Sequence, residues 1–128
     1  MILLDTSVVI DYWRRPRRVI EEALIKWKPC LCGVVLSELL QGAANEPDVA
    51  RTEKALAGFP WVDIPDGVWR QLGLNLSALR KAGLKVPFQD ALLATVALAH
   101  GMELWTLDTH FKHIQTILTD LKLFEAPQ

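Results

Sequence analysis

Residues 1–12 read Met-Ile-Leu-Leu-Asp-Thr-Ser-Val-Val-Ile-Asp-Tyr, and they combine a buried strand with the start of a helix. The apolar run over residues 2–4 stops at a carboxylate, Asp5, and a second apolar run with a different period follows two hydroxyl residues. In a parallel sheet covered on both faces, strands are continuous Val, Ile and Leu runs, and ligands bind outside their carboxyl ends. We therefore expect this strand in the middle of a sheet, with Asp5 at the ligand-binding edge.

The composition indicates a single domain over residues 1–128. Hydrophobic residues make up 51% of the chain and charged residues 23%, which is typical of a globular protein with a real core. The formal net charge of -1 neither favours nor excludes nucleic acid as a partner. No apolar stretch is long enough to span a membrane, and the start of the chain has no signal peptide, so we expect a soluble cytoplasmic protein. We interpret Cys30 and Cys32 as buried strand residues in a reduced environment.

Hydrophobic periodicity predicts strands that alternate with helices. The expected strands are residues 2–4, 30–32, 61–64, 103–107 and, at the edge, 121–124. The expected helices are residues 8–15 (capped by Thr6 or Ser7), 17–28, 34–44, 49–58, 66–81, 88–100 and 111–118. Each parallel return needs a crossover, so the pattern predicts an α/β fold with a mostly parallel sheet of four to five strands.

Four carboxylates occupy unusual positions in this pattern. Asp5 and Asp108 end two strands, Glu38 lies in an apolar helical stretch, and Asp90 lies in the first turn of the most apolar helix. Asp90 has a local explanation in the helix dipole, and Asp108 has one as a turn residue. Asp5 and Glu38 are harder to explain, because a carboxylate among apolar neighbours is costly unless it is paired or binds a metal.

If these four carboxylates meet, they repel one another. Two like charges about 4 Å apart cost on the order of 4 kcal/mol at an effective dielectric constant of about 20. Either protons or divalent cations must neutralise such a cluster, and oxygen ligands with open positions suit Mg²⁺ or Mn²⁺. A metal that acidifies water and binds phosphoryl oxygens indicates phosphodiester hydrolysis.

The four acids lie in four short motifs, which are Asp5-Thr6-Ser7, Ser37-Glu38-Leu39-Leu40-Gln41-Gly42, Gln89-Asp90-Ala91-Leu92-Leu93-Ala94 and Thr106-Leu107-Asp108-Thr109-His110-Phe111. These motifs resemble the four conserved blocks of PIN-domain ribonucleases, in order and spacing over nearly the whole chain. The resemblance extends in particular to the toxins of bacterial VapBC toxin–antitoxin pairs.

The resemblance implies a PIN-like three-layer sandwich, with helices on both faces of the sheet, and a Mg²⁺- or Mn²⁺-dependent endoribonuclease. It implies a homodimeric toxin that cuts RNA and is inhibited by a cognate antitoxin, whose basic or aromatic segment enters the acidic groove. Asp5 and Asp90 would bind metal, and Glu38 and Asp108 would bind it directly or through water. Three hydroxyl residues, Thr6, Ser7 and Thr106, would hold the acids by hydrogen bonds. Many relatives carry Asn where this chain has Ser7.

Substrate contacts are expected from basic residues near these motifs, because Lys and Arg bind phosphates without reading sequence. A solvated turn is the alternative for the run around Pro16. Trp13, Trp27 and Trp69 are expected either at a dimer or antitoxin interface or in the core. The candidate RNA contacts are Arg14, Arg15, Arg17, Arg18, Lys81 and Lys85.

Two other functions fit part of the pattern. One is a phosphoaspartyl hydrolase or phosphatase with Asp5 as nucleophile, although Ser7 stands where such sites usually have a second acid. The other is a non-enzymatic phosphoacceptor or binding domain, which gives no role to Glu38 and Asp90. Asp11 is interpreted as a solvated helix residue, and His110 and His113 as surface groups that at most contact RNA.

Overall fold

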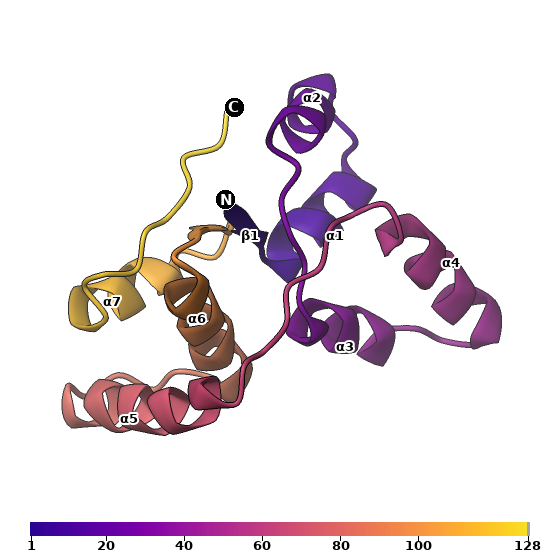
Figure 1. The fold of residues 1–128 in the computed structure, drawn as a ribbon. Helices are drawn as coiled ribbons and strands as arrows, with labels where there is room; N and C mark the ends of the chain where they lie inside the picture. The colour runs from indigo at the N-terminus through magenta and orange to yellow at the C-terminus, as the bar shows by residue number, and fades with distance from the viewer. Residues whose placement is uncertain (128) are drawn as a thin grey trace.

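Two parallel strands and seven helices make up the computed structural model over residues 1–127, the range that the structure describes. Strands β1 (Ile2–Leu4) and β2 (Glu103–Trp105) pair in parallel, with Leu3 opposite Leu104. In Figure 1, β1 lies between a group of helices formed by α1 to α4 and another formed by α5 to α7, which confirms the predicted α/β class. The helices are α1 (Thr6–Arg14), α2 (Arg18–Trp27), α3 (Gly33–Gln41), α4 (Glu46–Leu56), α5 (Gly67–Lys81), α6 (Phe88–His100) and α7 (His110–Ile117).

The regular sheet has two strands, so the predicted sheet of four to five strands is not confirmed. The other three expected strands shorten to single parallel bridges because helices and prolines interrupt them. Cys32 already precedes the first residue of α3, and Pro60 adjoins the bridge at Trp61. The bridges join Cys30 to Leu3, Trp61 to Leu31 and Leu123 to Leu104.

Helix α1 begins at Thr6, two residues before the predicted start. Asp5 occupies the N-cap position, and no side chain caps the helix. The prediction that Thr6 or Ser7 caps it is wrong, because both hydroxyls bind carboxylates elsewhere in the fold. Helix α4 also begins early, because the Asn45 side chain accepts a hydrogen bond from the backbone N–H of Asp48 at 3.0 Å.

Helix α6 passes through the core, as its apolar sequence predicts. Residues 91–97 are all buried. The Thr95 hydroxyl donates to the Ala91 carbonyl at 2.7 Å and accepts from the Asn75 side chain at 3.0 Å, which ties α6 to α5. Gly101 ends α6 with φ of 64°, a left-handed conformation that glycine adopts without strain. The chain then turns directly into β2, so α6 and β2 position the acids at their ends relative to each other.

Tryptophan is mostly a surface residue in this chain. Trp105 is 1% exposed, whereas the other four tryptophans are between 45% and 50% exposed. A core position is therefore wrong for Trp13, Trp27 and Trp69. Trp27 and Trp105 both contact the Phe124 ring, at centroid distances of 5.5 and 5.0 Å, and so hold the C-terminal segment against the body of the protein.

In the described part of the chain, none of the helices has the length and apolar character needed to cross a membrane. Both cysteines are free and buried, as expected.

We predict that Leu93→Ala lowers the free energy of unfolding by about 2–5 kcal/mol, because it leaves a cavity at a position of α6 that is 1% exposed. Urea denaturation followed by circular dichroism measures the loss. Leu74→Ala on α5 is the control, since Leu74 is 48% exposed and its truncation should change stability by no more than about 0.5 kcal/mol. Equal losses for the two variants would contradict the placement of α6 in the core.

Candidate active site

Asp5 lies at the carboxyl end of β1 and is held by hydroxyl groups. Its backbone N–H donates to the Trp105 carbonyl at 2.9 Å, which extends the pairing of β1 with β2 by one step. Its Oδ2 atom accepts hydrogen bonds from Ser7 Oγ at 2.6 Å and Thr106 Oγ1 at 2.7 Å. Both hydroxyls bind the same oxygen, so they fix the carboxylate without using Oδ1. At 6% exposure, Asp5 is a buried and oriented carboxylate.

The same hydroxyls fix the loop that carries Asp108. Ser7 Oγ accepts from the backbone N–H of Leu107 and Thr106 Oγ1 accepts from that of Asp108, both at 3.0 Å. Asp108 Oδ1 in turn accepts from the backbone N–H of His110 at 2.9 Å, at the start of α7. Ser7 thus ties the first turn of α1 to the end of β2. Its single hydroxyl both donates to Asp5 and accepts from the Leu107 backbone.

Glu38 reaches the same region from α3. Thr6 Oγ1 donates to Glu38 Oε1 at 3.0 Å, so consecutive residues of α1 hold two different acids. Burial raises the pKa of Glu38 above its ordinary value, and the charge of Asp5 raises it further. The hydrogen bond from Thr6 acts in the opposite direction.

Asp90 completes the group from the first turn of α6. Its pKa is raised to about 6, first by burial and then by the charges of Asp5, Asp108 and Glu38. The charge of His110 acts in the opposite direction. The fold therefore brings four acids, from the ends of two strands and from two helices, within electrostatic range of one another.

Comparison with known proteins agrees with this geometry. The family model described as PIN domain matches residues 2–117. The chain belongs to the PIN domain family. Among curated proteins, it is 28% identical over 127 residues to VapC ribonuclease Mb1587 of Mycobacterium bovis and, equally, to ribonuclease VapC11 of Mycobacterium tuberculosis. Each alignment covers 91% of this chain and 93% of the relative.

Solved structures share the fold of this PIN domain at low sequence identity. VapBC2 from Rickettsia felis, bound to a DNA fragment from its promoter, superposes with a TM-score of 0.82 at 20% identity and covers 99% of this chain and 100% of that one. VapBC-1 from nontypeable Haemophilus influenzae gives a TM-score of 0.83 at 20% identity, with 98% of each chain covered.

The donor atoms of this PIN domain fit a hard divalent cation that keeps most of its water. Within residues 1–127, no three His, Cys, Asp or Glu side chains form a preformed metal centre. Mg²⁺ usually binds through only one or two carboxylates, retained waters and substrate phosphates. The raised pKa of Asp90 and of Glu38 indicates negative charge that the protein itself leaves uncompensated. Carboxylates and hydroxyls are also the oxygen donors that such a cation prefers.

The arginines around Pro16 do not form one basic patch, because they pair with different carboxylates. Arg17 binds Asp11 at 2.6 Å and Arg15 contacts it at 3.5 Å, so Asp11 is a partly exposed helix residue that also pairs with arginines. The hydrogen bond from Arg17 lowers the pKa of Asp11. Arg18 pairs with Glu22 of its own helix.

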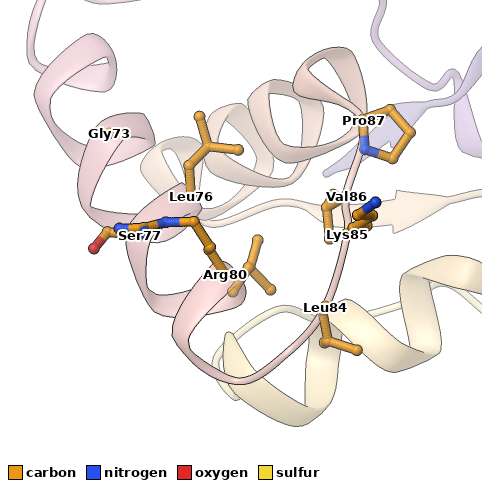
Figure 2. A pocket seen from close by; sticks show the side chains of 9 residues that line it. Gly73, Leu76, Ser77, Arg80, Leu84, Lys85, Val86 and Pro87 are labelled. Carbon is orange, nitrogen blue, oxygen red and sulfur yellow. The ribbon is translucent and has the colours of Figure 1, made fainter.

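The remaining basic candidates are also dispersed. Arg14 lines a groove between α1, α3 and α4 that also contains Glu38. Lys85 lines a cavity between α5 and the segment before α6, shown in Figure 2, whose lining includes none of the four acids. Lys81 is an exposed residue at the end of α5.

His110 is more buried than the sequence suggested. Its Nε2 atom is buried and has no hydrogen-bond partner in the described part of the chain, whereas His113 is exposed. His110 is therefore only partly a surface residue, because it is the first residue of α7 and its ring nitrogen is covered. The sequence signal for this burial was the apolar pair that follows His110 in α7, Phe111 and Ile114.

We predict that Thr106→Val destabilises the protein by about 1–3 kcal/mol, because it removes one of two hydroxyl donors from a buried carboxylate, Asp5. Thr106→Ser keeps the donor and should recover most of the loss. Thermal unfolding of the two variants measures the difference, with Thr119→Val at an exposed site as control. A Val variant as stable as the native protein would contradict the contribution of this hydrogen bond.

We also predict that Asp90→Asn stabilises the metal-free protein above pH 6, by on the order of 1 kcal/mol after allowance for solvent screening of a half-buried group. A raised pKa means that the folded state binds the proton more tightly than the unfolded chain. Native stability therefore falls as the pH rises from the ordinary value of 3.8 through about 6, and an amide removes that loss.

Urea denaturation in EDTA at about pH 4 and about pH 7.5, on either side of this window, measures the effect. The stabilisation by Asp90→Asn should be present at the higher pH and nearly absent at the lower. Asp120→Asn, at an exposed site, should show no such difference. A stabilisation that is equal at both values would refute the charge repulsion at Asp90.

Proposed function

We propose that this PIN domain is a metal-dependent endoribonuclease that hydrolyses RNA phosphodiester bonds and acts as the toxin of a toxin–antitoxin pair. The observation that carries the proposal is the convergence of four acids: hydroxyls hold Asp5 and Glu38, and burial, then the charges of the other three acids, raise the pKa of Asp90 to about 6. Four mutually repelling acids beside a rigid sheet edge need cations, and hydrolysis of a phosphodiester is the chemistry that such cations serve. The ribonuclease names of the curated relatives support the same reaction.

The site residues have different roles in this proposal. Asp5 and Asp90 would bind Mg²⁺ or Mn²⁺ directly, since one is fixed by two hydroxyls and the other is half-buried beside the other three acids, which raises its pKa to about 6. Glu38 would bind directly or through water from the position that Thr6 sets. Asp108 is exposed and accepts a hydrogen bond from His110, which suits contact through water.

The supporting hydroxyls limit how the acids can move. Thr6, Ser7 and Thr106 hold Glu38 and Asp5 in fixed orientations, so substrate binding needs no rearrangement of these carboxylates. A divalent cation bound here would lower the pKa of water and neutralise charge on the phosphoryl oxygens. The residues of the chain would supply the negative charge that binds the cation and the hydrogen bonds that orient the carboxylates.

A phosphoaspartyl mechanism with Asp5 as nucleophile has less support. Asp5 is 6% exposed and its Oδ2 atom already accepts two hydrogen bonds. The surrounding acids would also repel a phosphate group in the absence of a cation. A non-enzymatic binding domain likewise leaves the raised pKa of Asp90 without a role.

The proposed partner is a cognate antitoxin, in agreement with the solved structural neighbours VapBC2 and VapBC-1. Its basic or aromatic segment would occupy the groove between α1, α3 and α4, where Glu38 meets the exposed Trp13. We place the protein in the cytoplasm as a homodimer of single-domain chains. The predicted RNA contacts stay Arg14, Arg15, Arg17, Arg18, Lys81 and Lys85.

We predict that the purified chain cleaves single-stranded RNA in Mg²⁺ or Mn²⁺, and that Asp5→Asn or Asp90→Asn lowers the rate by at least about a hundredfold. Gel analysis of a labelled RNA, with and without EDTA, measures cleavage. Asp120→Asn removes an exposed carboxylate on the loop after α7 and should leave the rate unchanged. Activity that survives EDTA, or either active-site substitution, would sink the mechanism.

Binding of the cation can be followed without activity. Mg²⁺ or Mn²⁺ should raise the Tm of the metal-free native protein, because a ligand that binds only the folded state stabilises it. The shift should be smaller for Asp90→Asn and unchanged for Asp120→Asn. A native protein whose Tm does not respond to either cation would argue against the proposed metal ligands.

A further inference from the structure

A second groove opens directly from the acid cluster. It has a volume of about 1090 Å³ and lies between α1, α7 and the C-terminal segment at residues 123–127. Thr106 and Asp108 form part of its wall, so the groove continues from the residues that fix Asp5. We call it the α1–α7 groove. It is distinct from the groove that contains Glu38, which lies on the α3 and α4 side of α1.

Three cations from two helices and a loop line this groove. Arg15 and Arg17 come from the end of α1 and the turn that follows it, and Lys112 comes from α7. Arg17 is held at 2.6 Å by Asp11, which leaves it 33% exposed in a fixed position. Arg15 is 71% exposed and makes only a 3.5 Å contact with the same carboxylate. Within residues 1–127, Lys112 forms no ion pair. The groove therefore contains two cations, Arg15 and Lys112, whose charges are not fully paired with a carboxylate.

The groove also presents apolar surface next to the acids. Leu107, between Thr106 and Asp108, is 51% exposed. Phe124 lines the opposite part, and its ring is fixed by contact with Trp27 and Trp105. Cations along a groove together with apolar and aromatic surface suit a single strand, whose bases are free to make contacts. A duplex hides its base faces and offers mainly phosphates.

We propose that the α1–α7 groove binds single-stranded RNA next to the bond that is cut, with Arg15 and Lys112 on its phosphates and Leu107 against a base. The proposal rests on the ribonuclease function proposed above and names its substrate class. Arg17 belongs to the same wall, but its pairing with Asp11 makes it a weaker phosphate ligand than Arg15. Lys112 had no place among the contacts expected from sequence, because α7 brings it to the groove from almost a hundred residues away.

The test is binding of a labelled single-stranded RNA, measured by fluorescence anisotropy in EDTA so that no cleavage occurs. Arg15→Ala/Lys112→Ala should weaken binding roughly tenfold or more at low salt. The negative slope of log affinity against log salt concentration should become shallower by about 1.4, because each of the two lost phosphate contacts to a single strand contributes about 0.7. In cleavage assays, KM should rise by a similar factor with little change in kcat. Native protein should bind the duplex of the same sequence more weakly.

The control is Lys26→Ala/Lys54→Ala, which removes the same charge from exposed positions on α2 and α4 that do not line the groove. Circular dichroism confirms that both double variants are folded. The proposal is overturned if the groove variant binds RNA like the native protein, if the control loses as much affinity, or if the loss is the same for duplex RNA. Loss of antitoxin binding with unchanged RNA binding would also overturn it.

Failure of the groove and failure of the proposed function give different results. If the native protein cleaves RNA and the groove variant keeps its RNA affinity, the RNA-binding role of the groove is rejected and the proposed nuclease function stands. If the native protein binds RNA through Arg15 and Lys112 but does not cleave it, the RNA-binding role of the groove is supported and the proposed hydrolysis is rejected. Native protein that neither binds nor cleaves RNA overturns both.

Discussion

Repulsion among carboxylates is the constraint on which this structure depends. Asp5, Glu38, Asp90 and Asp108 approach one another at the end of two short strands, where burial and then the charges of the other three acids raise the pKa of Asp90 to about 6. Three hydroxyls partly offset that cost by donating to Asp5 and Glu38. A protein tolerates such a cluster when the rest of its fold is stable enough to hold it and when function requires it.

The rest of the fold supplies that stability. Helix α6 is buried over residues 91–97, so the first turn that carries Asp90 is anchored by the core behind it. Gly101 connects the other end of α6 to β2, and the backbone of β2 accepts the N–H of Asp5. Asp5 and Asp90 are therefore positioned by a paired strand and a buried helix, which are among the least mobile kinds of element.

Much of this could be predicted from sequence, because the strongest patterns were also the buried ones. The apolar run before Asp5 and the nearly all-apolar helix at 88–100 predicted the two elements that form the centre of the fold. The acids were recognised because charge is costly among apolar neighbours.

The failures had physical causes that lie outside local sequence. Thr6 and Ser7 are good capping residues, but partners 32 and 99 residues away compete for their hydroxyls, namely Glu38 and Thr106. The strand at Cys30 shortened because α3 begins almost at once. The groove position of Lys112 depends on how α7 packs, which no single segment encodes.

The single bridges at the flanks of β1 and β2 limit how another protein can attach. A partner that extends a sheet needs a run of free N–H and C=O groups along an edge strand. Here the flank of β1 is covered by the segment that pairs at Cys30, and the flank of β2 by the segment that pairs at Leu123. A partner that adds a strand would therefore meet these irregular segments before it could reach β1 or β2.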